Sequence, residues 1–438
     1  MGKYTITDIC NETGLTRYQV LCHINGQTLK AKKISGSYEI DDDAYNLWKK
    51  NIPDLHNVEK KSTFGEFEKG KYKDNNGDLF EEKTVEENVL NINQILQGID
   101  VDINSKFTFA DFFSGAGGIS CGFAAAGYRP VVFIDNFVDA TKTYRNYFEK
   151  ILGFNLNQKK DVLDITKKEI KKNVIDLLKL NHPYVICGGF PCQGFSLSGT
   201  SIATDARNTL YYDMLEIVNE IKPEYIVMEN VVGILSMLNG NVVRKILFDY
   251  EKIGYKITWK ILDAADYGVP QHRKRVIFIG NRIGYKNVFP KAFRNEITYS
   301  TVREAIARYE NMPESKQINH IMSKHSDDMK KRLMNVEVGK QLYEKYNDSW
   351  KKCSPDKPSC TIKENHGATN IHYSLPRVIT PREMAALQSF PENFFFVGNK
   401  SQQIKQIGNA VPPILAQAIA IALKDNICLL YTSDAADE

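Results

Sequence analysis

The sequence predicts an α/β fold with a doubly wound sheet that carries its ligand site at the carboxyl ends of its strands. Three apolar runs, residues 107–112, 130–134 and 184–187, have the composition of buried strands. Each run is followed by glycine-rich or polar sequence typical of a loop. Open α/β sheets bind ligands beyond the carboxyl ends of their strands, so we expect the chemistry in these loops.

The first strand leads into a glycine-rich turn, residues 114–118, before a predicted helix at 119–126. Glycines let the backbone approach a ligand closely, which predicts a cofactor-binding turn. The order Ser-Gly-Ala-Gly-Gly matches neither the phosphate-binding Gly-x-x-x-x-Gly-Lys-Ser/Thr loop nor the dinucleotide pattern Gly-x-Gly-x-x-Gly. We therefore expect a nucleotide-type cofactor that is not held by a phosphate loop.

The second strand ends in Asp135, about 20 residues beyond the turn, where such folds hold a ribose hydroxyl. The alternative is that Asp135 caps a helix predicted at residues 138–148.

The third strand precedes residues 188–197, Gly-Gly-Phe-Pro-Cys-Gln-Gly-Phe-Ser-Leu. Pro191 fixes φ immediately before Cys192, and a thiol on a loop at this edge of the sheet is a candidate nucleophile. The alternative is a buried structural cysteine in a glycine-rich turn, which is the interpretation we prefer for Cys187.

Together with later motifs, these segments resemble, in the same order, the cytosine-C5 DNA methyltransferases, which use S-adenosylmethionine. The resemblance covers about residues 106–424. Its motifs are Asp-Phe-Phe-Ser-Gly-Ala-Gly-Gly at 111–118, Asp-Val-Leu-Asp-Ile at 161–165, Gly-Phe-Pro-Cys-Gln at 189–193, Arg-Asn-Thr-Leu at 207–210, Met-Glu-Asn-Val at 228–231, Gln-His-Arg-Lys-Arg at 271–275, the segments 377–385 and 388–391, and Gln-Ile-Gly-Asn-Ala-Val-Pro-Pro at 406–413.

The resemblance implies a Rossmann-like methyltransferase sheet and a set of cofactor-binding residues. These are Phe112, Ser114, Gly115, Gly117, Gly118, Asp135, Asp161, Pro191, Asn409 and Ala410. Asp135 stands where the family usually has Glu. The adenine contact is assigned to Asp161 in preference to Asp164.

The resemblance also implies the catalytic residues. A thiolate of Cys192 that adds to carbon 6 of cytosine turns the ring into an enamine, whose carbon 5 attacks the methyl sulfonium. Glu229, after the apolar run 225–228, would protonate or hydrogen-bond ring nitrogen 3; the alternative is a surface carboxylate. Arg273 and Arg275 alternate along an extended segment and so share one side, where they would orient the base, a phosphate and the catalytic groups, unless they form a solvated face.

The reaction requires the cytosine outside the duplex stack, so we expect base flipping. Gln193 and Ser196, beside the predicted nucleophile, are expected to contact double-stranded DNA. Residues 298–364, a variable stretch in the family, would read base edges in the major groove. The formal net charge of +4 does not by itself distinguish a DNA-binding protein.

Residues 1–50 resemble the small winged helix-turn-helix domains of excisionase and MerR type. We predict that residues 5–10 lead into a short helix, followed by a turn at 14–16, a helix at 17–24, a two-stranded wing at 31–40 and a closing helix at 41–50. The second helix of such domains enters the major groove. The expected DNA contacts are Arg17, Tyr18, Gln19, Lys30, Lys32 and Lys33; the alternative is a structural cap.

The predicted organisation has six parts. These are a winged helix-turn-helix (1–50), a polar linker with a helix near 85–97 (51–105), the catalytic domain (106–297), a small target recognition domain (298–364), the return of the catalytic domain (365–427), and a tail (428–438). The tail resembles the translation of a sequencing adapter, and we exclude it from the fold.

Composition excludes some classes of site. The eight cysteines show neither a disulfide framework nor Cys-x-x-Cys spacing. Cys353, Cys360, His366 and His372 are irregularly spaced, so no metal site is expected. No signal peptide or membrane-spanning apolar run is recognised, which predicts a cytoplasmic protein.

We therefore expect a DNA (cytosine-5-)-methyltransferase that modifies a flipped cytosine in a short duplex site. Its setting would be a prokaryotic restriction–modification system, with a cognate endonuclease that is not a required subunit. The alternatives are an RNA cytosine-5 methyltransferase and a catalytically inert DNA-binding regulator.

Overall fold

The computed structural model forms two compact units, Met1–Glu66 with Lys73–Asn76, and Phe67–Tyr72 with Gly77–Glu438. The residues that it describes are 3–13, 29, 31–34, 37–51, 67–68, 71–72, 80–156, 158–191, 206–343, 350–364 and 370–434.

The N-terminal unit contains a three-stranded antiparallel sheet in the order β1-β3-β2. Its elements are β1 (Lys3–Thr5), α1 (Ile6–Thr13), β2 (Lys32–Ile34), β3 (Ser37–Asp41) and α3 (Asp42–Asn51). Ile6, Ile9, Leu29, Ile40 and Tyr45 form its buried core. The β2–β3 hairpin coincides with the expected wing, and β1 is a third strand that was not predicted.

The expected recognition helix at 17–24, with Arg17, Tyr18 and Gln19, lies outside the described residues, as does Lys30. Lys32 is exposed on β2, whereas for Lys33 only the backbone is described. The winged helix-turn-helix therefore stays a prediction.

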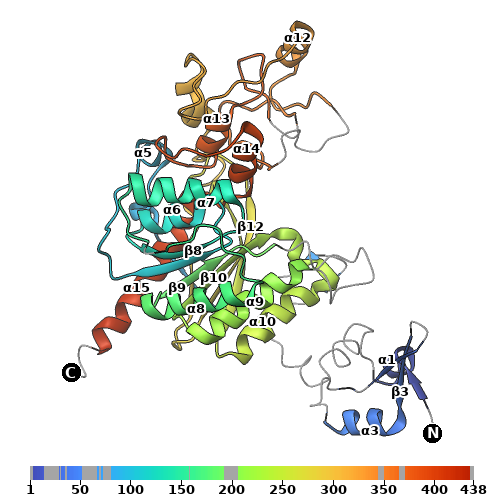
Figure 1. Cartoon of the computed structure of the whole chain (residues 1–438). Helices are drawn as coiled ribbons and strands as arrows, with labels where there is room; N and C mark the ends of the chain where they lie inside the picture. The colour runs from blue at the N-terminus through green and yellow to red at the C-terminus, as the bar shows by residue number, and fades with distance from the viewer. Residues whose placement is uncertain are drawn as a thin grey trace. The chain divides into compact units, whose positions relative to one another are not determined.

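The larger unit is built on a six-stranded mixed sheet in the order β11-β12-β10-β9-β7-β8 (Figure 1). The strands are β7 (Thr108–Phe112), β8 (Arg129–Ile134), β9 (Val185–Gly188), β10 (Tyr225–Val231), β11 (Lys256–Asp263) and β12 (Lys274–Asn281). Strands β8, β7, β9 and β10 are parallel, and β12 is antiparallel to both β10 and β11. The predicted doubly wound sheet is thus extended by an antiparallel edge.

Helices cover both faces of this sheet because successive strand residues point to opposite sides (Figure 1). Phe109 and Val185 belong to one core, and their neighbours Ala110 and Ile186 belong to the other. The first core includes α6 (Gly118–Ala125), α7 (Val138–Arg145) and α15 (Pro413–Asp434); the second includes α8 (Lys168–Asn181), α9 (Ala206–Ile221) and α10 (Asn241–Lys252).

The C-terminal segment returns to the first helix of the sheet. A Cβ atom on Gly118 would lie 2.2 Å from the carbonyl oxygen of Val411, and one on Gly122 would lie 2.3 Å from that of Pro413. Only glycine permits such close backbone contact. The segment before α15 therefore lies directly on the glycine-rich turn.

One described helical stretch, Lys400–Lys424, is long and apolar enough to cross a membrane by length and composition, with a mean hydropathy of 1.4. The sequence led us to expect no such run. However, 89% of its apolar window is buried inside the fold, as in the core helix of a globular unit. The backbone of α15 continues to Asp434, into the tail that the sequence set apart.

Residues 80–105, expected to belong to a polar linker, pack onto the larger unit. Strand β6 (Phe80–Lys83) pairs in parallel with β13 (Asn287–Pro290). Helix α5 (Ile92–Gln97) starts at a capping box and buries Ile92, Ile95 and Leu96. The spacing of these three apolar residues places them on one helix face, a signal that the polar surroundings obscured.

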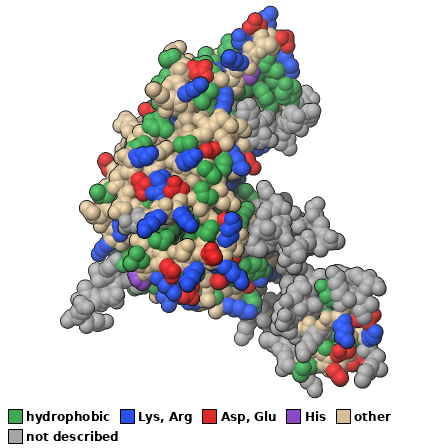
Figure 2. Space-filling view, in the orientation of Figure 1, with side chains coloured by type: hydrophobic (Ala, Val, Ile, Leu, Met, Phe, Trp, Pro, Cys, Tyr) green, Lys and Arg blue, Asp and Glu red, His purple; other side chains and the backbone are tan. Residues whose placement is uncertain are grey.

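The expected recognition stretch, residues 298–364, contains α11 (Val302–Ile306) and α12 (Asp327–Asn335). It is followed by α13 (Pro381–Leu387) and α14 (Lys400–Asn409). Helix α12 lies at the end of the larger unit farthest from α8, α9 and α10 (Figure 1). On the face in Figure 2, basic and acidic side chains are interspersed, which fits the small net charge of the chain.

Candidate active site

A cleft of about 710 Å³ opens at the carboxyl ends of β7, β8, β9 and β10, within the size range of small-molecule sites. We call it the catalytic cleft. The predicted site residues that line it are Ser114, Gly115, Gly118, Asp135, Pro191, Glu229, Arg273, Arg275, Asn409 and Ala410. The fold thus brings together motifs that are up to about 300 positions apart, as expected for this edge of an α/β sheet.

The glycine-rich turn differs from its prediction at two positions. Phe112 is fully buried in the sheet, and its neighbour Phe113, at φ 57°, lines the cleft instead. Gly117 does not line the cleft; a Cβ there would lie 2.5 Å from the ring of Phe148. Gly117 therefore shapes the turn at φ 97°, whereas at Gly115, with φ 54°, a Cβ would meet no atom within 4 Å.

A buried hydrogen-bond network around Asp111, at the end of β7, joins the strand to helices α6 and α7 beside the turn. Asp111 Oδ2 accepts a hydrogen bond of 2.6 Å from Ser120 Oγ, which is 2.8 Å from Tyr144 Oη. Burial raises the pKa of Asp111 to about 7. Asp111 is fully buried, so we assign it a structural role beneath the cleft.

Asp135 braces the turn from the end of β8. Its carboxylate accepts hydrogen bonds from the backbone nitrogens of Gly115 (2.8 Å) and Phe137 (2.7 Å). Burial raises the pKa of Asp135. The N-cap of α7 is Phe137, so the alternative assignment of Asp135 as that cap is not observed.

Of the two candidate adenine-binding acids, Asp164 lines the cleft and Asp161 does not. Asp164 lines the cleft with Leu163 and Ile165, and the Leu163 nitrogen donates to the carbonyl of Asp135 at 2.9 Å. Asp161 is absent from the lining and pairs with Arg145 Nε at 2.6 Å. The preference for Asp161 is therefore not supported by the geometry. Leu163 and Ile165, which flank Asp164, are both apolar and are buried in the fold; these apolar neighbours are the sequence feature that could have favoured Asp164.

Residues 192–205 lie outside the described residues, so Cys192, Gln193 and Ser196 are not placed. The segment that leads to them is well defined. Pro191 lines the cleft, and Asn230 Nδ2 donates to the carbonyl of Phe190 at 3.0 Å. Cys187 is fully buried in β9, which agrees with a structural role.

Glu229 and Arg275 form an ion pair at the wall of the cleft. Arg275 Nε lies 2.7 Å from Glu229 Oε1, and both side chains are 13% exposed. The antiparallel pairing of β10 with β12 brings them together. Gly189 leaves room for this pair, because a Cβ there would lie 3.0 Å from Glu229 Oε2. The pair places a carboxyl group and a guanidinium side by side at the cleft wall, and both groups can hydrogen-bond a planar ligand.

Arg273 lines the same cleft as Arg275, as predicted, but its hydrogen bonds differ from those of Arg275. It is 1% exposed, and its Nη1 and Nη2 donate to the carbonyls of Ile362 (3.0 Å) and Gly408 (2.8 Å). Burial lowers the pKa of Arg273 to about 9, so the guanidinium stays charged at neutral pH. Its contacts are those of a positioning residue rather than of a catalytic one.

Two glutamines extend this anchor, and neither was assigned a role from sequence. Gln271 Oε1 accepts from the Ile362 nitrogen at 2.7 Å, and its Nε2 donates to Gln388 Oε1 at 2.9 Å. Gln388 Nε2 then donates to the carbonyl of Ile407 at 2.7 Å. All of these groups are buried and paired, as such groups must be to be tolerated.

Two further charged residues line the cleft without having been predicted. Lys405 lies 5.0 Å from the ring centroid of Phe137. Glu364 accepts a hydrogen bond of 2.9 Å from Asn409 Nδ2. No motif signalled either residue, because the fold alone brings residues 364 and 405 to the cleft.

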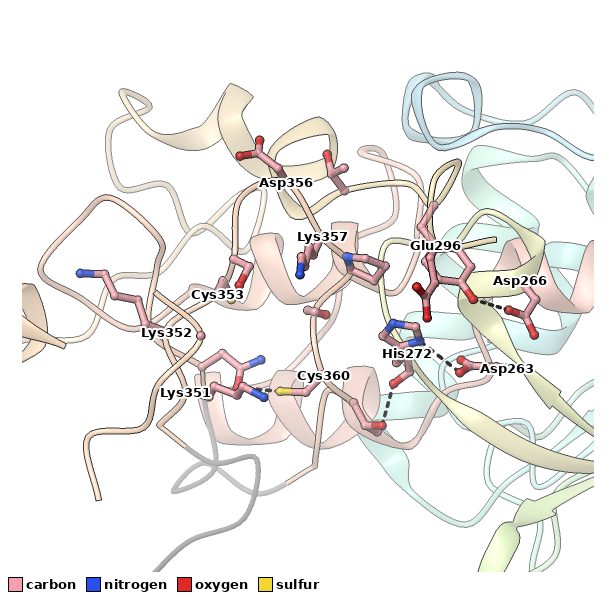
Figure 3. Close-up of a pocket in the computed structure, with 18 of the residues that line it drawn as sticks. Asp263, Asp266, His272, Glu296, Lys351, Lys352, Cys353, Asp356, Lys357 and Cys360 are labelled. Atoms are coloured by element: carbon pink, nitrogen blue, oxygen red, sulfur yellow. Dashed lines mark hydrogen bonds and ion pairs between the residues drawn. The ribbon is translucent and has the colours of Figure 1, made fainter. Parts of the chain in front are cut away.

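A second hollow, of about 1100 Å³, is lined in part by the same segment 271–275 (Figure 3). His272 and Lys274 line it, whereas Arg273 and Arg275 line the catalytic cleft. His272 Nδ1 lies 3.1 Å from Asp263 Oδ2. Cys353 and Cys360 also line this hollow. Within the described part of the chain, no group of three His, Cys, Asp or Glu side chains is arranged to hold a metal ion.

Comparison with known proteins gives consistent results. The model of the family described as C-5 cytosine-specific DNA methylase matches residues 107–425. The chain is 36% identical over 339 residues to the Type II methyltransferase M1.HphI of Haemophilus parahaemolyticus, covering 73% of this chain and 87% of the relative. It is 32% identical to M.DdeI of Desulfomicrobium norvegicum, covering 74% and 91%.

Among solved structures, the chain is similar to a prophage-encoded E. coli protein described as a DNA modification methyltransferase. The TM-score is 0.59 at 26% identity, covering 74% of this chain and 100% of the other.

The contacts of Arg273 predict that replacement by Met destabilises the fold more at position 273 than at position 275. Arg273→Met would leave the carbonyls of Ile362 and Gly408 without their donors, and we expect a loss of about 2–5 kcal/mol in the free energy of unfolding. Arg275→Met removes the partner of Glu229 at the cleft wall and an exposed hydrogen bond to the Lys274 carbonyl; because neither links distant backbone segments, the loss should be less than half as large. Urea unfolding of both variants measures the difference; equal losses would contradict the positioning role.

Proposed function

The chain belongs to the C-5 cytosine-specific DNA methylase family and is a DNA (cytosine-5-)-methyltransferase; we propose that it takes the methyl group from S-adenosylmethionine and places it on a cytosine flipped out of a short duplex site. One observation carries this proposal. The catalytic cleft joins the glycine-rich turn and Asp135 to the Glu229–Arg275 pair and to Pro191, the residue before Cys192.

The residues of the cleft fit this cofactor. The absence of a side chain at Gly115 leaves space at the turn, since a Cβ there would have no atom within 4 Å. Carboxylates at 135 and 164 suit ribose hydroxyls and an adenine amino group, both hydrogen-bond donors. We propose that Phe113, Ser114, Gly115, Gly118, Asp135, Asp164, Asn409 and Ala410 hold S-adenosylmethionine, with Asp164 replacing Asp161. When bound, this cofactor supplies an electrophilic methyl group on a sulfonium.

The chain's own residues then act on the cytosine. The Cys192 thiolate adds to ring carbon 6, and the electron pair of the carbon 5–carbon 6 double bond makes carbon 5 nucleophilic. After methyl transfer, carbon 5 gives its proton to a water molecule, and the electron pair of that bond re-forms the double bond as the carbon 6–sulfur bond breaks, which restores the ring and the thiolate. In this step the carboxyl group of Glu229 carries a proton and donates it in a hydrogen bond to ring nitrogen 3, while Arg275 Nε positions Glu229 through its 2.7 Å contact with Oε1.

Duplex DNA is the proposed substrate, with residues 298–364 reading the site and Gln193 and Ser196 contacting the strand beside the flipped base. We propose that residues 1–50 add a winged helix-turn-helix contact through Arg17, Gln19, Lys32 and Lys33. The chain is at least 32% identical to two Type II methyltransferases. We therefore place it in a cytoplasmic restriction–modification system, with a cognate endonuclease that acts separately.

Incubation of the protein with tritiated S-adenosylmethionine and mixed-sequence duplex DNA tests the function, with bisulfite sequencing to map the product. We expect label on carbon 5 of cytosine within one short sequence, and a loss of at least about 10³-fold for Cys192→Ser, because the nucleophile is removed. Cys360→Ser, whose thiol lies in the second hollow, is the matched control and should stay active. Label on tRNA alone would favour the RNA enzyme, and label on neither would favour the inert regulator.

The two candidate adenine acids are separated by a binding measurement. Asp164→Asn should weaken S-adenosylmethionine binding about tenfold, as expected for loss of a hydrogen bond to a charged acceptor. Asp161→Asn removes only the contact with Arg145 and should change the affinity less than twofold. Isothermal titration calorimetry gives both dissociation constants, and the opposite order would restore the assignment to Asp161.

A further inference from the structure

We propose that Glu364 binds the α-ammonium group of S-adenosylmethionine, so that the recognition stretch contributes a residue to the cofactor site. Glu364 is an exposed carboxylate that lines the catalytic cleft from the end of segment 350–364. This inference rests on the proposed function, because it requires S-adenosylmethionine to be the ligand of the cleft.

The position of Glu364 is determined by contacts on two sides. Two residues earlier, the backbone of Ile362 is held by Gln271 Oε1 at 2.7 Å and by Arg273 Nη1 at 3.0 Å. On the other side, a Cβ on Gly408 would lie 2.3 Å from the Glu364 nitrogen. The backbones of residues 364 and 408 therefore touch, two residues from the buried anchor at Ile362.

The carboxylate is directed by a neighbour in the closing motif. Asn409 Nδ2 donates to Glu364 Oε2 at 2.9 Å. The next residues of this motif lie on the glycine-rich turn, because a Cβ on Gly118 would lie 2.2 Å from the Val411 carbonyl and 3.1 Å from Ala410 Cβ. Glu364 is thus placed where the turn and the closing motif meet.

The charge of Glu364 is not neutralised by the described residues. Glu229 is paired with Arg275, and Asp135 accepts two backbone N–H groups. Asp164 accepts from the nitrogen and hydroxyl of Thr166. Within the described part of the chain, the neutral amide of Asn409 is the hydrogen-bond partner of Glu364, and no cationic side chain forms an ion pair with it. This leaves acceptor positions for a cationic ligand group.

The chemistry of S-adenosylmethionine indicates which of its groups Glu364 would bind. S-adenosylmethionine carries two positive centres, an ammonium that donates hydrogen bonds and a sulfonium that has no N–H. An ionised carboxylate only accepts hydrogen bonds, so it matches the ammonium in both charge and geometry. S-adenosylhomocysteine keeps the ammonium and lacks the sulfonium charge. Methylthioadenosine lacks the whole amino-acid part, so the three ligands separate the possible contacts.

Calorimetric titration of the full chain with these three ligands tests the proposal. Glu364→Gln keeps the shape of the side chain and removes its charge. We expect about tenfold weaker binding of both S-adenosylmethionine and S-adenosylhomocysteine, as for one charge-assisted hydrogen bond, and unchanged binding of methylthioadenosine. Glu337→Gln, which changes an exposed acid elsewhere on the recognition stretch, is the matched control and should bind all three ligands like the wild type.

Several results would overturn the proposal. A loss confined to S-adenosylmethionine would indicate a contact with the sulfonium instead. An equal loss for methylthioadenosine would mean that Glu364 acts only through the shape of the cleft, and no loss would exclude any contact. In each case the wild type would still bind the cofactor. A wild-type chain that binds none of the three ligands would overturn the proposed cofactor itself, and this inference with it.

Discussion

The two hydrogen bonds from the buried Arg273 guanidinium are the interaction on which the catalytic cleft depends. They join the start of β12 to Ile362 in the recognition stretch and to Gly408 in the closing motif, segments 89 and 135 positions away. Gln271 and Gln388 continue the same network. Burying a guanidinium costs free energy unless it is hydrogen-bonded. Any arrangement that separated Arg273 from these two carbonyls would therefore be unfavourable, so the segments are held in one arrangement. The wall that carries Glu364, Asn409 and Arg275 follows from it.

This anchor links the two ligands of the enzyme. The segment that ends at Glu364 belongs to the stretch expected to read DNA, and it also borders the cleft proposed for the cofactor. The nucleophile segment is held separately, by Asn230 on the Phe190 carbonyl. The Glu229–Arg275 pair, which we propose binds the base, lines the same cleft. Two polar anchors therefore support the cleft, one at Arg273 and one at Asn230, each within two residues of a proposed catalytic residue.

Much of the sheet and the cleft could be predicted from sequence, because buried strands and glycine-rich turns have local signatures. The strands around 109, 132 and 186 and the side shared by Arg273 and Arg275 were confirmed. The cleft is lined by Phe113 and Asp164, one and three residues beyond the predicted Phe112 and Asp161, because a motif resemblance does not determine which of two nearby side chains faces a cleft. The depth of Arg273 could not be predicted either, since burial depends on Ile362 and Gly408, which are distant in sequence.

Trapping of the covalent intermediate tests the central claim most directly. Duplex DNA synthesised with 5-fluorocytosine is incubated with the protein and S-adenosylmethionine. A base can remove a proton from carbon 5 but cannot remove fluorine, so the cysteine adduct persists. We expect a denaturation-resistant complex that forms only with the cofactor and, after proteolysis, a nucleotide attached to the peptide containing Cys192. No adduct, or an adduct on another cysteine such as Cys360, would contradict the proposed mechanism.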